Sequence, residues 1–159
     1  MCRSIQKKSG AQPVLIQLNA FEDGALRHRL ILSPKHRILL GDTAGQEVLA
    51  PAKAFVGLKG LRHMRGRQEI EYISILFDRH HILDVSGLAA ESFLPGLQGQ
   101  RLLSARERAE VRQVLTTCDT PMAPARPCLG GSEGQRALAA GGRPQVFPRL
   151  RLVKSSLRA

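Results

Sequence analysis

Two histidine-bearing turns hold the residues of this sequence that could do chemistry. In the first, Ser33 precedes His36 by three residues, across a turn that contains Pro34. In the second, Asp78 precedes His80 by two residues. Histidine suits proton transfer because it titrates near neutral pH and can donate a proton from one ring nitrogen. A hydroxyl and an imidazole held across a tight turn could position one peptide bond for attack, which is the chemistry of self-processing proteins.

Ordinary structural roles are the alternatives for the same side chains. Ser33 could bond only to the backbone of its own turn, as serine often does. His36 could equally be a surface histidine or a satisfied core histidine. Asp78 is expected either to orient His80 or to cap the bend beside it. The residues alone leave these alternatives open.

The second turn also has the composition of a loose metal cluster, with His80 and His81 beside Asp78 and Asp84. Successive side chains on a strand point to opposite faces, so the two histidines are not expected to bind one ion. The three cysteines have no Cys-x-x-Cys spacing, which argues against a zinc site and against a disulfide framework. We therefore expect no metal, no cofactor and free thiols.

The elements that must position the two turns are predicted to be strands, and β structure is expected to dominate residues 13–86. The prediction rests on short apolar segments that are separated by turn-forming residues. Pro51 is expected to make its strand an edge strand or to break it. Residues 57–68 are expected to form a basic connection. The predicted strands cover residues 13–18, 29–32, 37–40, 47–56, 69–77 and 81–85.

Beyond residue 100 the pattern changes to helix. Ser104 and Glu107 have the spacing of a capping box, and apolar residues then recur at helical intervals. This predicts a helix over residues 104–116. A second capping pattern begins at Ser132 and predicts a helix that ends at a Gly-Gly pair. Residues 143–159 are expected to be poorly ordered.

Three ordered motifs resemble the Hint (Hedgehog/intein) domain family, in its bacterial form. Residues 32–39 (LSPKHRIL) are similar to the turn that carries a Thr-x-x-His motif in inteins and Hedgehog domains. Residues 49–53 (LAPAK) are similar to the family's apolar segment with Val-Pro-Ala-Lys or Arg. Residues 78–80 (DRH), which follow a strand containing Tyr72, and residues 87–93 (GLAAESF) are similar to the family's final motifs. Three linked motifs are more specific than one Ser-x-x-His.

The resemblance covers residues 13–95 and implies an all-β, Hint-type fold. After an irregular N-terminus of residues 1–12, we expect a partial Hint domain over residues 13–98. A helical, basic, partly disordered tail is expected over residues 99–159. The resemblance implies autoproteolysis by an N-to-S acyl shift in the chain's own polypeptide or a fused upstream region. It makes four side chains the candidate catalytic residues: Ser33, His36, Asp78 and His80.

Two departures from the family pattern change the expected activity. Inteins end in His-Asn, and this Asn cyclises to cut the C-terminal bond, whereas the equivalent position here reads Glu91-Ser92. Splicing is therefore not expected, and Glu91 is expected to matter less than His36. The family's Cys-containing N-terminal block has no counterpart here, and Cys2, behind only Met1, is not expected to replace it. We expect this chain to be inactive alone, or to act only when another chain supplies the missing half.

The charge distribution suggests a competing function. Residues 101–159 hold 11 Lys or Arg against 4 Asp or Glu, which gives +7 of the net charge of +11. Such a tail attracts nucleic acid and anionic surfaces, so a non-catalytic module that binds polyanions through the tail and the arginines of residues 62–67 is the main alternative. Only Phe147 could stack on bases there, so weak binding is expected. A degraded gene product without stable function is the third alternative.

No compartment is assigned from the sequence. It has no run of 18 apolar residues, so no membrane span is expected. Residues 1–10 lack an apolar stretch of signal-peptide length. Relatives in the family are often fused to exported proteins, but no residue of this chain indicates export.

Overall fold

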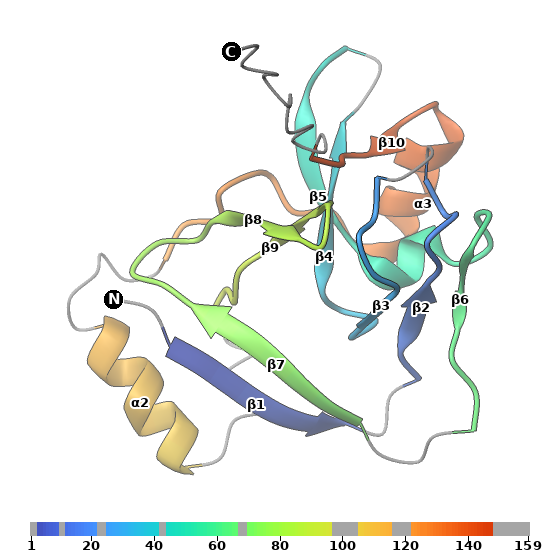
Figure 1. The fold of residues 1–159 in the computed structure, drawn as a ribbon. Coiled ribbons are helices and arrows are strands. Elements are labelled where there is room, and N and C mark those ends of the chain that lie inside the picture. Colours follow the sequence, from blue (N-terminus) through green and yellow to red (C-terminus); the bar gives the residue numbers. More distant parts are fainter. Residues whose placement is uncertain are drawn as a thin grey trace, which may run out of the picture.

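Antiparallel β-strands dominate the fold, which a computed structural model describes. Within the described residues the strands form three sheets, accompanied by two α-helices and one short 3₁₀ helix (Figure 1). The all-β prediction is therefore confirmed. The structure describes residues 3–9, 12–21, 25–41, 44–66, 70–96, 105–115 and 122–147.

The largest sheet is built around β4 (Arg37–Gly41), which pairs along its whole length with β5 (Glu47–Pro51). On its other edge, the beginning of β4 meets β9 (Leu88–Glu91) and its end meets β10 (Arg143–Pro144). The strand β8 (Ile82–Val85) completes the sheet beside β9. This topology brings the residues that precede β4 close to the residues that end β9.

Two smaller sheets complete the β structure. The strands β3 (Leu30–Leu32), β2 (Val14–Ile16) and β6 (Leu61–His63) form one of them, in that order. The other is a ribbon of β1 (Arg3–Ser9) and β7 (Ile70–Leu76).

The main core lies between the largest sheet and the three-stranded sheet and is almost entirely aliphatic. The 3₁₀ helix η1 (Ala52–Phe55) supplies its one fully buried aromatic side chain, Phe55. Ile16 of β2, Leu40 of β4 and Leu88 of β9 are also fully buried and belong to the same core cluster. Burial of these side chains is the main stabilising term, at about 25 cal/mol per Å² of apolar surface removed from water.

The helix α2 (Ala105–Leu115) covers one face of the β1–β7 ribbon (Figure 1). Its Val111 packs with Leu76 of β7, and both side chains are buried. The prediction of a helix over residues 104–116 is confirmed, although its capping residue Ser104 lies outside the described residues. On the opposite face of β7, Ile73 and Ile75 are 66% and 39% exposed.

The segment of residues 122–147 packs on the β core. It lies within residues 99–159, which were expected to form a helical, basic, partly disordered tail. Its helix α3 (Gly131–Ala139) lies against β5 and η1, with Gly134 touching the core. Residues 143–147, expected to be poorly ordered, join two strands of the largest sheet: Gln145 donates its N–H to Leu39 and accepts one from Ala89. Long-range backbone pairing of this kind leaves no local signal in the sequence.

Helix α3 begins one residue before the predicted cap. Its N-cap is Gly130, whose N–H is bound by the carboxylate of Glu133 at 2.6 Å. The carboxylate thus satisfies one of the donors left free at a helix start. At the other end Gly141 adopts a positive φ of 97°, which confirms that the Gly-Gly pair ends the helix.

Three further differences concern strands. Residues 1–12 were expected to be irregular, but Arg3–Ser9 form β1, whose polar sequence gives no hydrophobic alternation and whose structure depends on pairing with β7. The strand expected over residues 47–56 ends at Pro51, because η1 follows at once. The connection expected over residues 57–68 contains β6, a short strand whose only buried residue is Leu61.

The sequence predicts the strand that ends at Val85, but it does not predict that this strand, β8, forms a hairpin with β9. Ser86 and Gly87 form its two-residue turn, with φ values of 57° and 100°. Two positive φ values are the mark of a type I′ turn, which suits the twist of paired strands. A Cβ at Gly87 would lie 1.9 Å from the carbonyl oxygen of Ala25, so the chain also needs glycine here for space.

Candidate functional site

The Ser-Pro-Lys-His turn is closed and anchored by backbone hydrogen bonds. Proline at the second position favours a turn because its φ is already fixed near the required value. The N–H of His36 donates to the carbonyl oxygen of Ser33 at 3.0 Å. The start of η1 holds the turn from the other side: Lys53 donates its N–H to Pro34 at 3.1 Å, and Ala52 donates to His36 at 2.8 Å. The imidazole of His36 is therefore carried by a rigid backbone.

His36 presents a buried ring nitrogen without a partner. Its Nε2 atom is inaccessible to solvent and makes no hydrogen bond within the described part of the chain. Burial lowers the pKa of His36, the carboxylate of Glu91 partly raises it again, and the charges of Arg37 and His80 lower it further. The net direction is downward, so His36 is neutral at pH 7.

Glu91 is the charged centre of the site. The pairing of Ile38 with Ala90 places the end of β9 beside the start of β4, and so Glu91 beside Arg37. The Oε1 atom accepts the backbone N–H of Arg37 at 2.9 Å, and Oε2 lies 3.3 Å from both the Arg37 guanidinium and Nε2 of His80. The Glu91 side chain is only 8% exposed.

The contacts of Glu91 keep it ionised. Burial alone would raise the pKa of this carboxyl group. The hydrogen bond from His80, the charges of Arg37 and His36 and the N–H of Arg37 outweigh burial and lower it. The site therefore holds a buried anion that interacts electrostatically with His36.

His80 is fully buried, and both of its ring nitrogens are engaged. Its Nε2 atom lies 3.2 Å from the carbonyl oxygen of Ser92 and 3.3 Å from Oε2 of Glu91. Its Nδ1 atom accepts the backbone N–H of Ala125 at 2.9 Å. The side chain has 0% exposure. His80 is positioned as a donor toward Glu91.

Ser92 fixes the backbone beside His80. Its N–H donates to the carbonyl oxygen of His81 at 2.8 Å, and its hydroxyl accepts the N–H of His81 at 2.9 Å. The next residue, Phe93, donates its N–H to Ile75 of β7. The contacts of Glu91 and Ser92 thus fix the groups around His80.

Of the four predicted site residues, two interact with Glu91. His36 and His80 both interact with the carboxylate of Glu91, His36 from the turn before β4 and His80 from the loop before β8. Ser33 is half-buried in its turn and uses its carbonyl oxygen to close it. Asp78 is exposed, and the groups that contact the ring nitrogens of His80 come from other residues. The ring nitrogens of His80 are thus held by Ser92, Glu91 and Ala125, and the role of Asp78 stays a prediction. The catalytic roles themselves stay predictions.

Sequence reasoning missed three groups of the site. The sequence predicts a smaller role for Glu91 than for His36, and it presents Arg37 only as one residue of the motif at residues 32–39. Both residues belong to the motifs that resemble the Hint family, so the sequence could have suggested a buried Glu–Arg pair. The N–H of Ala125 could not be found in the same way, because a backbone group carries no residue-type signal.

No group of three or more His, Cys, Asp or Glu side chains in the described part of the chain could hold a metal ion. His80 is buried whereas His81 is exposed. No helix in the described ranges is long and apolar enough to cross a membrane. Cys128 is a free thiol whose pKa is raised by burial.

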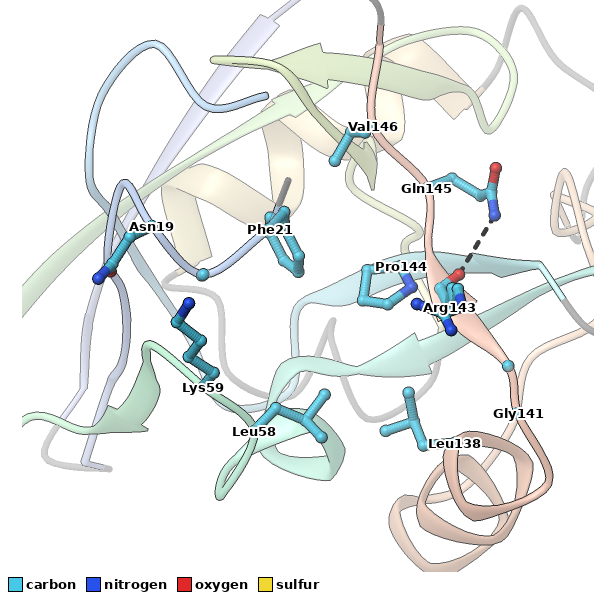
Figure 2. Close-up of a pocket in the computed structure, with 12 residues that line it drawn as sticks. Asn19, Phe21, Leu58, Lys59, Leu138, Gly141, Arg143, Pro144, Gln145 and Val146 are labelled. Carbon is cyan, nitrogen blue, oxygen red and sulfur yellow. Dashed lines mark hydrogen bonds between the residues drawn. The ribbon is translucent and has the colours of Figure 1, made fainter. Parts of the chain in front are cut away.

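A separate cavity of about 880 Å³ lies at the far end of β4, where β10 pairs with it. Figure 2 shows Phe21, Leu58 and Leu138 around it, with Lys59 and Arg143 on different sides. Its lining contains no histidine and no carboxylate. This cavity therefore offers no acid–base pair and is distinct from the site around Glu91.

The antiparallel sheets and the histidine turn at the start of β4 define a Hint-type all-β fold. The family model described as Hint domain matches residues 1–97, which is more than half of the chain, and the chain belongs to this family. The match includes β1, which the resemblance drawn from motifs did not cover. A search of curated proteins and a search of solved structures found no match. The packed segment of residues 122–147 lies beyond the family match.

Proposed function

We propose that the site around Glu91 supports an autoproteolytic N-to-S acyl shift, with His36 as the group that moves the proton. One observation carries the proposal: the Nε2 atom of His36 is buried and has no hydrogen-bond partner within the described residues, while the charge of Glu91 acts on this neutral ring. A general base needs its free form at the working pH, and a nearby anion stabilises the imidazolium that forms when it accepts a proton.

The reaction would begin with attack by a cysteine thiol on the carbonyl carbon of the peptide bond before it. The thiol proton moves to Nε2 of His36 as the S–C bond forms and the carbonyl oxygen takes up negative charge. The imidazolium then gives this proton to the amide nitrogen as the C–N bond breaks. The products are a thioester and a free amine, and His36 is neutral again. An added thiol would release the upstream polypeptide by thioester exchange.

The substrate is the chain's own polypeptide or a region fused upstream of it. The 159 residues contain no segment that resembles the family's Cys-containing block. We therefore propose that the chain does not cleave itself alone and becomes active when such a block is placed against His36. Splicing is not proposed, because Glu91 and Ser92 cannot cyclise as asparagine does.

The test is thiol-induced release of a reporter from a fusion protein. The reporter precedes a Cys-containing Hint segment, which is followed by residues 1–159. His36→Ala should slow release by roughly two to four orders of magnitude, the usual contribution of a general acid–base group. The control is His28→Ala, because His28 is exposed and makes no contact with the site. Equal release rates from the parent fusion and His36→Ala would refute the assignment.

A further inference from the structure

We infer that the backbone N–H of Ala125 is a positioning group that holds His80 in the tautomer with its proton on Nε2. Ala125 lies in the segment of residues 122–147, beyond the family match at residues 1–97. The segment would therefore be a working part of the site. The effect on cleavage rests on the proposed function, whereas the tautomer can be measured without it.

The tautomer follows from the partners of the two ring nitrogens. A neutral imidazole carries one N–H and one acceptor nitrogen. Ala125 can only donate, and its nitrogen lies 2.9 Å from Nδ1, so Nδ1 must be the acceptor. The groups near Nε2 are the carbonyl oxygen of Ser92 at 3.2 Å and Oε2 of Glu91 at 3.3 Å, and both accept. All three contacts therefore agree on a proton at Nε2.

The other tautomer would lose all three contacts at once. A proton on Nδ1 would point at the N–H of Ala125, and the lone pair of Nε2 would face two oxygen atoms. His80 is fully buried, so water cannot replace the lost partners. Leaving buried polar atoms unpaired costs each of them its desolvation penalty without a compensating bond. The N–H of Ala125 thus selects between two states of the ring.

The backbone around Ala125 is held in place by the β core. Pro124 and Pro127 flank it closely and restrict the chain, because the proline ring fixes φ. The carbonyl oxygen of Pro127 accepts the N–H of Leu49 at 2.8 Å, and Leu129 donates its N–H to Leu49 at the same distance. These bonds join the segment to the free edge of β5. The position of the Ala125 N–H is therefore set by the sheet.

Ala125 would act on the reaction through two intermediaries. With its proton on Nε2, His80 donates toward Glu91 and holds one carboxylate oxygen in place. Glu91 in turn places its negative charge near His36, the group that would move the proton. Loss of the Ala125 N–H would leave Nδ1 of His80 without its donor, and the ring could adopt the other tautomer. Glu91 would then lose the donor that holds its Oε2 atom and would change its orientation. Small displacements of groups at a reacting centre can cost up to about a hundredfold in rate.

Nuclear magnetic resonance of the full 159-residue chain tests the tautomer directly. Long-range proton–nitrogen correlation of ¹⁵N-labelled histidine distinguishes Nδ1 from Nε2 protonation, and the signal that disappears in His80→Gln identifies His80. We expect a protonated Nε2, an acceptor Nδ1 and a ¹⁵N–¹⁵N coupling across the hydrogen bond from Ala125. A protonated Nδ1, or the absence of that coupling, overturns the inference in the unaltered chain, without any variant.

A matched pair of proline substitutions tests the role of the N–H. Ala125→Pro removes it and should abolish the coupling and add the second tautomer of His80. Ala123→Pro introduces proline into the same segment, but the N–H of Ala123 makes no hydrogen bond within the described residues, so the tautomer should not change. An unchanged tautomer in Ala125→Pro, or the same change in both variants, overturns the inference.

The reporter fusion separates this inference from the proposed function. Ala125→Pro should slow thiol-induced release by about tenfold to a hundredfold, and Ala123→Pro should not. If Ala125→Pro changes the tautomer but release stays within twofold of the parent, the link from His80 to catalysis is refuted. If the parent fusion never releases its reporter, the proposed function fails and the measured tautomer still decides the positioning of His80.

Discussion

At the scale of single residues, Glu91 connects all the charged groups of the site. Its two oxygens accept from the backbone and guanidinium of Arg37 and face His80, while its charge acts on His36. A buried carboxylate is stable only when its oxygens are satisfied by donors, and here both are. Glu91 thus has both a structural and an electrostatic role in the site.

Replacing this carboxylate by its neutral isostere should destabilise the fold. In Glu91→Gln one oxygen becomes an NH₂ group, which would face either the N–H of Arg37 or Nε2 of His80, and both of these are donors. We expect the free energy of unfolding to fall by about 1–3 kcal/mol, measured by urea denaturation. The control is Glu47→Gln, because Glu47 forms an exposed ion pair with Arg126 and should lose less than about 1 kcal/mol. Equal losses would contradict the role of Glu91.

The lowered pKa of His36 predicts how stability depends on pH. The unfolded chain takes up a proton on this histidine as the pH falls through about 6.5, whereas the folded chain keeps it neutral to a lower pH. The contribution of His36 to stability is therefore full above pH 6.5 and is lost as the pH falls toward the folded pKa. The lowered pKa of Glu91 acts only below its ordinary value of 4.5, outside this window.

Urea denaturation between pH 7.5 and about 5 would measure this loss. We expect the free energy of unfolding to decrease across the range, and His36→Gln to flatten the decrease. His28→Gln, at an exposed position, serves as the control and should leave the slope as it is. A slope that does not change in His36→Gln would show that His36 is not the titrating group.

At the scale of elements, α3 attaches the C-terminal segment through a contact that only a small residue permits. Gly134 is buried against the largest sheet and η1, where a Cβ would lie 3.0 Å from the Cβ atoms of Ala50 and Ala54. The sequence of α3 alone would place glycine among the weak helix formers. The glycine is explained by the close approach of the helix to the β core.

Filling this contact should loosen the helix from the core. Gly134→Leu would force the helix away from Ala50 and Ala54, and overpacking of this kind costs about 1–3 kcal/mol. Thermal unfolding followed by circular dichroism would show the lower midpoint. Ser132→Leu, at an exposed position of the same helix, is the matched control and should change the midpoint little. A Gly134→Leu variant as stable as the parent would mean that α3 does not pack closely.

At the scale of the whole molecule, the net charge of +11 favours association with polyanions. Several arginines are already paired with acidic residues, as Arg27 is with Asp84, Arg37 with Glu91 and Arg126 with Glu47. The remaining positive charge is dispersed and has little aromatic surface beside it. Binding through phosphate contacts alone is weak and independent of base sequence.

Fluorescence anisotropy with two labelled oligonucleotides of different sequence would test this expectation. We expect the same weak affinity for both, and a decrease of roughly tenfold between 50 and 200 mM salt, as a few phosphate contacts produce. An uncharged dextran of similar size serves as the control and should not bind. Tight binding that persists at 200 mM salt would favour the alternative of a dedicated polyanion-binding module.

Much of the fold could be predicted from the sequence because its signals are local. Apolar segments between turn residues located β2, β3, β4, β7 and β8, and the capping and helical spacing located α2 and α3. The linked motifs around His36 and His80 identified the Hint family, and the family match confirms it. In each case a few neighbouring residues are sufficient to determine the backbone.

Tertiary structure alone decided the contacts between distant segments. The ribbon of β1 and β7, the pairing of residues 143–147 with the largest sheet and the bond from Ala125 to His80 all depend on backbone groups. Every residue except proline carries the same backbone donor and acceptor, so the residue types do not predict which backbone groups will pair. The sequence determined which side chains could do chemistry, and the packing of the chain decided that Glu91, with Ala125 acting through His80, organises them.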